Sequence, residues 1–121
     1  MSSGGSALAE RKFRTEYATQ RAADGYAHGN AELDRLPYLT TGRMARQWQV
    51  RARSFDALCR VLLAPARKAK RVPLSILDLG AGCAWLCHRV SLGGDSAVAL
   101  DVRDDNVDGL GAATHYLEGT V

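Results

Sequence analysis

The stretch LDLGAGCAWL, residues 77–86, constrains the fold of this chain more than any other part of the sequence. It completes the apolar run Leu74–Leu79, which follows a proline, lacks polar alternation and stops at a glycine. A run of this length between such residues is typical of a strand buried on both faces of a parallel sheet. The small residues that come next turn the chain, and Trp85–Ser91 has the composition of a helix.

A second apolar run, Ser96–Val102, also ends near an acidic residue. Strand, helix and strand at this spacing predict a βαβ unit with parallel strands and a right-handed crossover. Beyond it, we expect residues 104–116 to form a helix that starts on solvated acidic residues and is broken or capped around Gly109 and Gly111. The segment His115–Val121 is expected to begin a third strand.

Two helices are expected before the sheet. Ser6–Ala23 is rich in Ala, Glu, Arg and Lys and ends before a segment with two glycines. Residues 40–63 follow a candidate N-cap at Thr40 or Thr41 and contain an apolar stripe of helical spacing, typical of core packing. The stripe is Met44, Trp48, Phe55, Cys59 and Leu62, and a row of Arg46, Arg53 and Arg60 marks a different, solvated face. Ala64–Pro73 is expected to break the helix as an exposed linker.

These patterns predict an α/β fold class, with two to three parallel strands preceded by N-terminal helices. The chain divides into a flexible leader at residues 1–10, an N-terminal helical segment at 11–71 that forms a cap, and the βαβ part at 72–121. The length of 121 residues allows one domain at most.

Composition narrows the class of protein further. The apolar fraction of 46% is ordinary for a globular protein, and no run approaches the ~18 apolar residues of a membrane span. The N-terminus shows no apolar signal core, and three cysteines make no disulfide framework. We therefore expect a cytoplasmic protein with no membrane partner.

Charge is distributed unevenly along the chain. Met1–Arg71 holds 14 Lys and Arg against 6 Asp and Glu, whereas Val72–Val121 holds 2 against 7. A basic half can bind nucleic acid, but the sequence offers no aromatic platform or motif that supports such a partner. The interpretation we prefer is that the basic half packs beside the acidic half.

The glycine-containing turn after the first strand predicts a ligand site. Ligands of open α/β sheets bind beyond the carboxyl ends of the strands. Gly80 and Gly82 allow a tight turn and a close backbone approach to a ligand. Asp101 lies 19 residues after Gly82, where an acid closing the second strand accepts the hydroxyls of a ribose. A ligand that contains a nucleoside is therefore expected.

Two residues near the turn, Trp85 and Asp78, indicate which kind of nucleoside ligand is expected. A dinucleotide fingerprint needs a small residue where this chain has Trp85, whose indole obstructs the close approach of helix and strand. Asp78 would repel a pyrophosphate but suits a ligand that carries a positive group. The pattern present is D-x-G-x-G-x-A, from Asp78 to Ala84.

The stretch ILDLGAGCAWL resembles the first motif of class I S-adenosylmethionine-dependent methyltransferases, D-x-G-x-G-x-G, and AVALDV resembles their second motif. The resemblance covers Tyr38 to about Tyr116 and departs from the family pattern at Ala84, where a third glycine is expected. It implies an incomplete Rossmann-like class I methyltransferase sheet, of which this chain supplies the N-terminal portion. The chain alone is expected to have no turnover, because the later strands of the family would carry the catalytic residues and most of the acceptor pocket.

The resemblance also implies roles for the residues of the motif. The turn formed by Gly80, Ala81 and Gly82 would run along the methionine portion and the ribose of S-adenosylmethionine. Asp78 would order the amino group of this ligand. Asp101 would hold the ribose hydroxyls, and Val102 would pack on the adenine. Methyl transfer in the intact enzyme would be a direct displacement that depends on proximity and orientation. The acceptor is unknown, with a small molecule expected.

Two other functions remain open at this point. The chain could be a catalytically inactive nucleoside-binding or interaction module, or an NAD-type dinucleotide-binding half-domain. Tyr38 and Arg43 are candidates to cap the pocket and meet the carboxylate of the ligand. Cys83, Cys87 and His88 do not complete a four-ligand set, so no metal is predicted.

Overall fold

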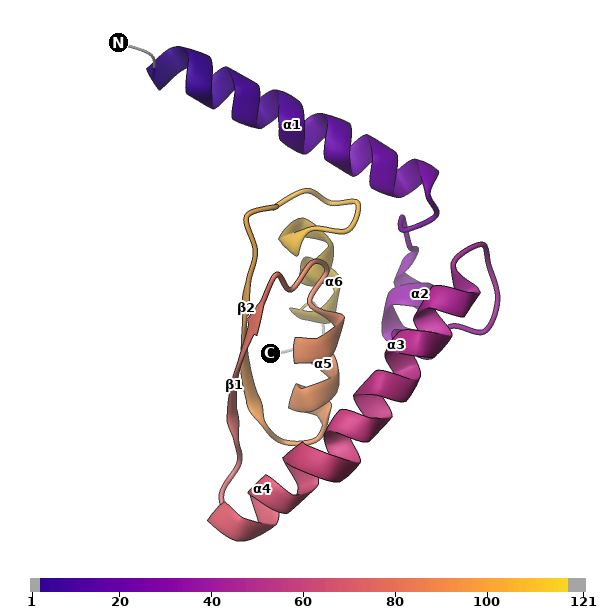
Figure 1. Cartoon of the computed structure of the whole chain (residues 1–121), viewed down its shortest axis with the longest axis vertical. Coiled ribbons are helices and arrows are strands. Elements are labelled where there is room, and N and C mark those ends of the chain that lie inside the picture. The colour runs from indigo at the N-terminus through magenta and orange to yellow at the C-terminus, as the bar shows by residue number, and fades with distance from the viewer. Residues whose placement is uncertain (1–2, 118–121) are drawn as a thin grey trace.

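A computed structural model of the chain describes residues 3–117 (Figure 1). The helices before the sheet are α1 (Ser3–Ala23), α2 (Asn30–Arg35), α3 (Ala45–Leu58) and α4 (Ala64–Lys70), with a π-helical turn, η1, at Cys59–Leu63. The remaining elements are β1 (Ser75–Leu79), α5 (Trp85–Leu92), β2 (Ser96–Leu100), the 3₁₀ turn η2 (Leu110–Ala113) and α6 (Thr114–Leu117). No helix within residues 3–117 is both long enough and apolar enough to cross a bilayer.

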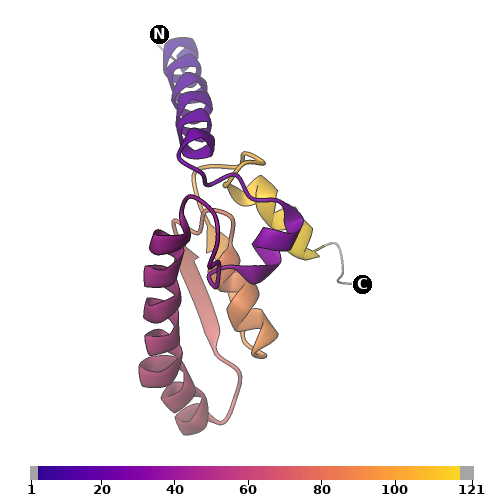
Figure 2. The same cartoon turned by 90° about the vertical axis from the view of Figure 1, so that its right-hand side faces the viewer.

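The predicted βαβ unit is confirmed. Strands β1 and β2 are parallel and in register from the pair Ser75 and Ser96 to the pair Leu79 and Leu100. Helix α5 connects them and packs on one face of the pair, as Figures 1 and 2 show. Its buried Val90 belongs to a cluster against which Ile76 of β1 and Ala97 of β2 pack.

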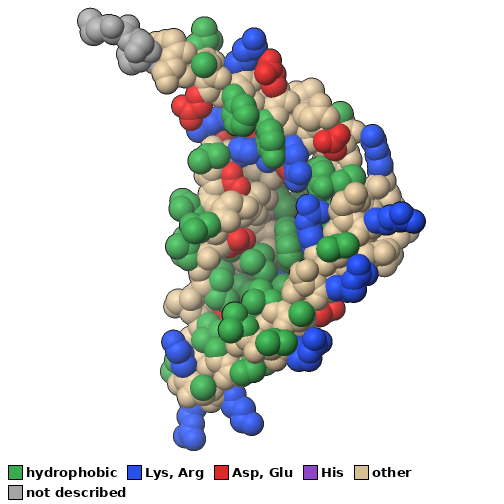
Figure 3. Space-filling model, viewed as in Figure 1, with side chains coloured by type: hydrophobic (Ala, Val, Ile, Leu, Met, Phe, Trp, Pro, Cys, Tyr) green, Lys and Arg blue, Asp and Glu red, His purple; other side chains and the backbone are tan. Residues whose placement is uncertain are grey.

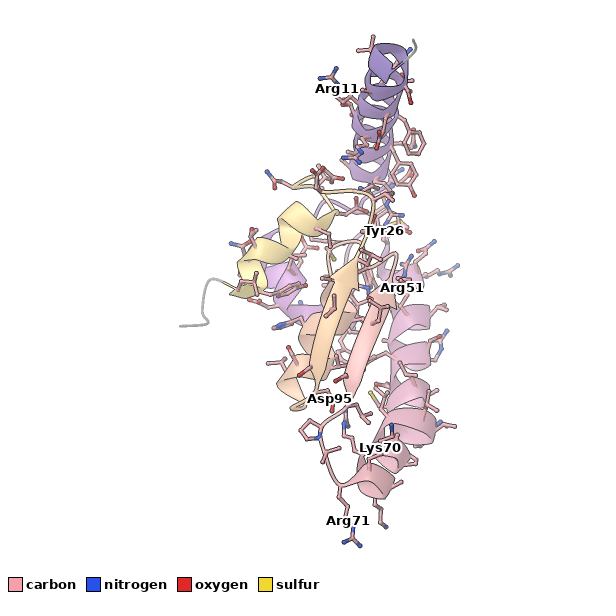
Figure 4. All side chains as sticks on the ribbon, turned by 90° about the vertical axis from the view of Figure 1, so that its left-hand side faces the viewer. Arg11, Tyr26, Arg51, Lys70, Arg71 and Asp95 are labelled. Atoms are coloured by element: carbon pink, nitrogen blue, oxygen red, sulfur yellow. The ribbon has the colours of Figure 1, made fainter. Side chains whose placement is uncertain are left out.

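The prediction that both faces of the strands are buried is wrong. The side chains that face α5 are half-buried, but the alternate leucines and valines are 56–68% exposed. These exposed residues are Leu77, Leu79, Val98 and Leu100. No described element covers this face, which is turned toward the viewer in Figure 4. An apolar run without alternation places apolar side chains on both faces of a strand. Within residues 3–117, however, the helices pack against only one face of the sheet.

The segment expected as a linker is helical. Helix α3 continues through η1 into α4, and Pro65 lies in the first turn of α4, where the absence of an N–H is tolerated. The helix stops at Arg71, which adopts a left-handed conformation (φ 58°). The N-cap of α3 is Met44, not Thr40 or Thr41, and no side chain caps the first turn.

The π-helical turn also changes which apolar residues are buried. Trp48 and Phe55 of the predicted stripe are buried, whereas Leu62 is 58% exposed and Leu63 takes its place in the core. A π turn adds one residue to the helical period and so rotates the following face. The predicted solvated row is confirmed, because Arg46, Arg53 and Arg60 are all exposed. Figure 3 shows blue Lys and Arg side chains along the outer edge of α3 and α4 and apolar side chains between these helices and the strands.

Two clusters of buried side chains meet at one tryptophan. The first joins the N-terminal segment to the turn after β1 and to η2: Tyr26, Leu33, Leu36, Leu39, Trp48, Cys83 and Ala112. The second joins α3 and η1 to α5 through Phe55, Leu63 and Val90. Trp85 packs against both clusters. The first residue of α5 therefore ties the βαβ unit to the helices before it.

The ends of the described chain also depart from expectation. Helix α1 begins at Ser3, within the segment expected to be a leader, and it projects beyond the rest of the molecule (Figures 1 and 2). Residues 114–117 form α6 instead of the start of a third strand, and residues 118–121 of that expected strand lie outside the described residues. Between β2 and α6 the chain forms turns and the short η2, not one long helix.

Within residues 3–117, three ion pairs between arginine and aspartate join the basic half of the chain to the acidic half. Arg21 Nε lies 2.5 Å from an oxygen of the buried Asp108, and Arg67 pairs with the buried Asp95. A third, more exposed pair joins Arg14 to Asp104 at 3.6 Å. The two halves of opposite charge are thus in direct contact in the fold.

Candidate functional site

The turn at residues 80–84, here called the glycine loop, lies at the carboxyl ends of β1 and β2. The amides of Gly80 and Ala81 both donate to the Leu100 carbonyl oxygen, at 2.8 and 3.1 Å, which fastens the loop to the end of β2. Gly80 and Gly82 adopt left-handed conformations with φ of 73° and 58°. Glycine tolerates this region without steric cost, so the sequence suits the turn.

Ala84, where the resembling family has its third glycine, also adopts a left-handed conformation (φ 63°). It is the N-cap of α5 and is buried. An alanine in this region carries a steric cost because its Cβ approaches the following carbonyl. The backbone at this position therefore has the conformation that a glycine favours, although the residue is an alanine.

Asp101 is placed directly beside the glycine loop. Its Oδ2 accepts a hydrogen bond from the Gly82 amide at 2.7 Å, and its Oδ1 accepts one from the Arg103 amide at 2.9 Å. Each carboxylate oxygen has a further lone pair that is free to accept. Val102, which follows in the chain, is 75% exposed.

Asp78 is the second carboxylate at this edge of the sheet. Burial, and then the charge of Asp101, raise the pKa of Asp78 above its ordinary value. Two neighbouring carboxylates repel each other and favour a cation between or beside them. The structure thus brings together Asp78, Asp101 and the glycine loop, while Ala81 of the loop is buried and supports its packing.

A cavity of about 170 Å³ lies over the glycine loop. Residues of the N-terminal segment form its opposite wall: Arg21, Tyr26, His28, Trp48 and Arg51. Figure 4 shows Tyr26 and Arg51 at the carboxyl end of the strands, with Asp95, Lys70 and Arg71 at the other end of the molecule. The helical segment before the sheet therefore contributes half of the candidate site.

Aromatic rings fix the cationic side chain in this wall. The Arg51 guanidinium lies 4.8 Å from the Trp48 ring centroid and 5.4 Å from that of Tyr26. The Trp48 ring packs edge-on against His28 and Trp85, with centroid separations of 5.5 and 5.9 Å. Three nitrogen atoms of this wall are buried and have no hydrogen-bond partner among residues 3–117: His28 Nε2, Trp48 Nε1 and Arg51 Nη1.

The acidic segment after β2, residues 104–109, contributes Asp108 to the lining of the cavity. Asp108 is buried and pairs with both Arg21 and Arg103. Asp105 Oδ2 accepts the amides of the three residues Val107, Asp108 and Gly109 at 3.1–3.2 Å. The expected helix start at these acids is therefore wrong: no helix begins there, and only Asp104 is exposed to solvent, as expected.

Tyr38 and Arg43 do not lie in the cavity wall, which corrects their expected role. The Tyr38 hydroxyl donates to Asp56 at 2.6 Å, and burial together with this carboxylate raises the pKa of Tyr38 to about 12. Arg43 donates to the Ala23 carbonyl oxygen at 2.5 Å. The cationic residues of the wall opposite the loop are Arg21 and Arg51, which the sequence analysis missed. For Arg51, the spacing of three from Trp48, a core residue of the same helix, was the available signal.

The cysteines of this region are not activated. Burial raises the pKa of the Cys83 thiol to about 11, so the side chain stays protonated at neutral pH. No group of three or more His, Cys, Asp or Glu side chains within residues 3–117 is arranged to hold a metal ion. Comparisons of the chain with protein-family models, curated proteins and solved structures find no match.

Proposed function

We propose that the glycine loop binds S-adenosylmethionine and that the chain is the cofactor-binding, N-terminal part of a class I methyltransferase. The observation that carries the proposal is the contact between the Asp101 carboxylate, at the end of β2, and the Gly82 amide of a loop with left-handed glycines. This juxtaposition suits a ribose, whose hydroxyls would donate to the free lone pairs of the carboxylate while the backbone approaches closely.

The surroundings of the loop support a ligand with a positive charge. A Cβ at Gly80 would meet no atom within 4 Å, so the outer surface of the loop is open. Asp78 and Asp101 place two carboxylates at this edge, where an ammonium or sulfonium group would relieve their mutual repulsion. A pyrophosphate would instead add further negative charge beside them.

The chemistry of the intact enzyme would be a methyl transfer. Bound S-adenosylmethionine supplies a methyl group on a sulfonium: the acceptor's lone pair forms the new bond to that carbon, the carbon–sulfur bond breaks, and sulfur keeps the electron pair as a thioether. The residues of this chain would bind and orient the ligand, Asp101 at the ribose and Asp78 at the amino group. We assign no general acid or base within the chain and expect the chain by itself to be inactive.

Isothermal calorimetry tests the proposal with S-adenosylhomocysteine and NAD as probes. We expect S-adenosylhomocysteine to bind and NAD not to bind. Asp101→Asn should weaken binding by about tenfold or more, since it removes the charge and one acceptor oxygen. Asp104→Asn is the matched control, because this carboxylate lies in the same segment but is 82% exposed. Preferential binding of NAD would identify a dinucleotide-binding half-domain instead.

A second candidate is an interaction module without catalysis. The exposed apolar face formed by Leu77, Leu79, Val98 and Leu100 favours it, because contiguous exposed apolar residues mark association surfaces. Folded protein that binds neither S-adenosylhomocysteine nor NAD but forms a stable oligomer in sedimentation experiments would support this candidate over the methyltransferase.

A further inference from the structure

We propose that the outer face of α3, η1 and α4 binds the phosphate backbone of double-stranded DNA without reading its sequence. Six cationic side chains define this face and are here called the basic row: Arg46, Arg53, Arg60, Lys68, Lys70 and Arg71. Figure 3 shows blue side chains along the outer edge of these helices, and Figure 4 shows Lys70 and Arg71 at their lower end. The inference goes beyond the proposed function and does not depend on it.

The fold neutralises only a small part of the charge of the basic half. Of its 14 Lys and Arg, three form ion pairs with aspartates of the acidic half within residues 3–117: Arg14, Arg21 and Arg67. Between positions 43 and 71 the chain holds nine Lys and Arg against one acid, Asp56. That carboxylate already accepts the hydroxyl of Tyr38. The long helix therefore keeps a surplus of positive charge that the packing of the two halves does not explain.

The side chains of the basic row are all exposed, and none forms an ion pair with another residue in the range 3–117. The helix dipole favours the cations in the last turn of α4, such as Lys68 and Lys70. It opposes Arg46, which lies in the first turn of α3, and is too distant to favour Arg53 or Arg60. The energetics of the helix itself therefore do not account for the row.

The spacing of the basic row suits the surface of a duplex. Arg46, Arg53 and Arg60 are seven residues apart, so they lie on one side of the helix at steps of about 10.5 Å. The major groove of B-form DNA is about 12 Å wide, so successive arginines can contact phosphates on its two sides. The helix from Ala45 to Lys70 is about 39 Å long, close to the ~34–36 Å of one duplex turn.

The apolar residues of this face favour a DNA duplex over other nucleic acids. Proteins that bind single strands stack the bases on exposed aromatic rings. The structure describes all of residues 45–70, and the exposed large apolar side chains there are aliphatic: Val50, Val61 and Leu62. Trp48 and Phe55 are buried in the core. An RNA duplex has a deep and narrow major groove, which does not match the steps between the arginines.

A lipid surface fits the basic row less well than DNA does. A helix that binds at a membrane interface inserts a wide apolar face between the lipids. In this chain, the apolar face of α3 and η1 is already used, because Phe55 and Leu63 pack in one cluster with Val90 of α5. What remains for a partner is chiefly charge, and a polyanion provides the complement.

Fluorescence anisotropy with a labelled DNA duplex of about 20 base pairs tests the proposal across a series of KCl concentrations. We expect a Kd of about 10⁻⁵ M near physiological salt and a slope of log K against log salt of about −5, because each phosphate contact contributes about −0.9. The combined substitution Arg46→Gln, Arg53→Gln and Arg60→Gln should weaken binding by about tenfold or more and reduce the slope by about 3. The same three positions changed to Lys, which keeps the charge, should retain the slope.

The matched control removes the same net charge elsewhere on the surface. It combines Arg11→Gln, Lys12→Gln and Arg35→Gln, all at exposed positions of α1 and α2, and should leave the slope unchanged. Urea unfolding identifies a variant that has lost its fold. Lys68→Gln with Lys70→Gln then replaces the arginine set, with an expected reduction of the slope by about 2.

Four outcomes overturn the proposal. They are no binding of duplex DNA by the native protein, equal weakening by the row variant and the control, tighter binding to the single strand or to an RNA duplex, and tighter binding to vesicles of phosphatidylserine and phosphatidylcholine in equal amounts. Calorimetry with S-adenosylhomocysteine separates this proposal from the proposed function, since the row variant should bind that ligand as the native protein does. If the native protein binds DNA through the row but not S-adenosylhomocysteine, the proposed function fails and the DNA-binding face stands.

Discussion

The Asp101 carboxylate accepts a hydrogen bond from the Gly82 amide at 2.7 Å across the ends of two neighbouring strands. The same side chain accepts the Arg103 amide, which begins the acidic segment below the cavity. One carboxylate thus fixes the glycine loop, the end of β2 and the segment that follows. Its proposed contact with a ribose would add to this structural role, not replace it.

Replacing Asp101 should therefore lower stability as well as binding. Asp101→Ala leaves two amides without their acceptor, and we expect the free energy of unfolding to fall by about 1–3 kcal/mol. Urea denaturation followed by circular dichroism measures the change. Asp104→Ala, which loses only a surface pair with Arg14, should alter stability by less than about 0.5 kcal/mol. Equal effects of the two substitutions would contradict the structural role of Asp101.

Ala84→Gly should stabilise the protein slightly. The native residue has φ 63°, and relief of its steric cost of about 1–2 kcal/mol exceeds the entropy lost by a new glycine. We expect a net gain of about 0.5 kcal/mol, read from the urea midpoint. The matched control is Ala81→Gly in the same loop, where φ is not positive and the substitution should destabilise. The idea fails if both substitutions shift the midpoint in the same direction.

Gly111→Ala should destabilise the segment below the cavity. A Cβ at this position would lie 2.6 Å from the Asp104 carbonyl oxygen and 2.8 Å from that of Asp105. Backbone atoms cannot move aside cheaply, so we expect a loss of about 1–3 kcal/mol. Gly5→Ala, which meets no atom within 4 Å in α1, should not lower stability. Thermal unfolding of both variants under one buffer condition gives the comparison.

Stability should fall on mild acidification because of His88. Burial, and then the charge of Arg89, lower the pKa of His88 from its ordinary 6.5. The unfolded chain then binds the proton at a higher pH than the folded chain does. The free energy of unfolding therefore decreases as the pH falls from above the ordinary pKa of 6.5 to below the lowered pKa of the folded chain. His88→Gln should reduce the difference in urea midpoint between about pH 7.5 and about pH 5.5. An unchanged difference would show that His88 does not contribute to it.

The βαβ unit could be predicted closely from local signals. The sequence predicted a strand at Leu74–Leu79 and a helix at Trp85–Ser91, and the structure has Ser75–Leu79 and Trp85–Leu92. An apolar run between Pro73 and Gly80 marks the first strand, and one that follows Gly93, Gly94 and Asp95 marks the second, without any knowledge of the tertiary structure. Which face of the strands is covered is a tertiary property, and there the prediction was wrong.

The errors in the helical segment have a physical cause as well. Proline at position 65 predicted a break, but the π-helical turn before it lets the helix continue to Lys70. The same turn moves the buried position from Leu62 to Leu63. A π turn leaves no reliable mark in the spacing of apolar residues, so neither change could be predicted.

The residues of the candidate site also fall into two groups, those that a local sequence pattern predicts and those that tertiary packing brings to the site. The residues of the glycine loop and Asp101 are close in sequence to the strands that position them, and their pattern revealed them. Arg51 and Trp48 reach the loop only because α3 packs against α5 through Trp85. A contact across some thirty residues of chain is set by packing, and no local pattern specified it.

The contact between Trp48 and Trp85 has an optical consequence. These are the only two tryptophans in the sequence, their ring centroids are 5.9 Å apart, and both line the cavity over the glycine loop. Nearly all of the intrinsic fluorescence of the protein therefore originates at the candidate site, beside the cationic Arg51. The chain carries its own unlabelled reporter, and any molecule that enters the cavity changes the surroundings of the emitting groups directly.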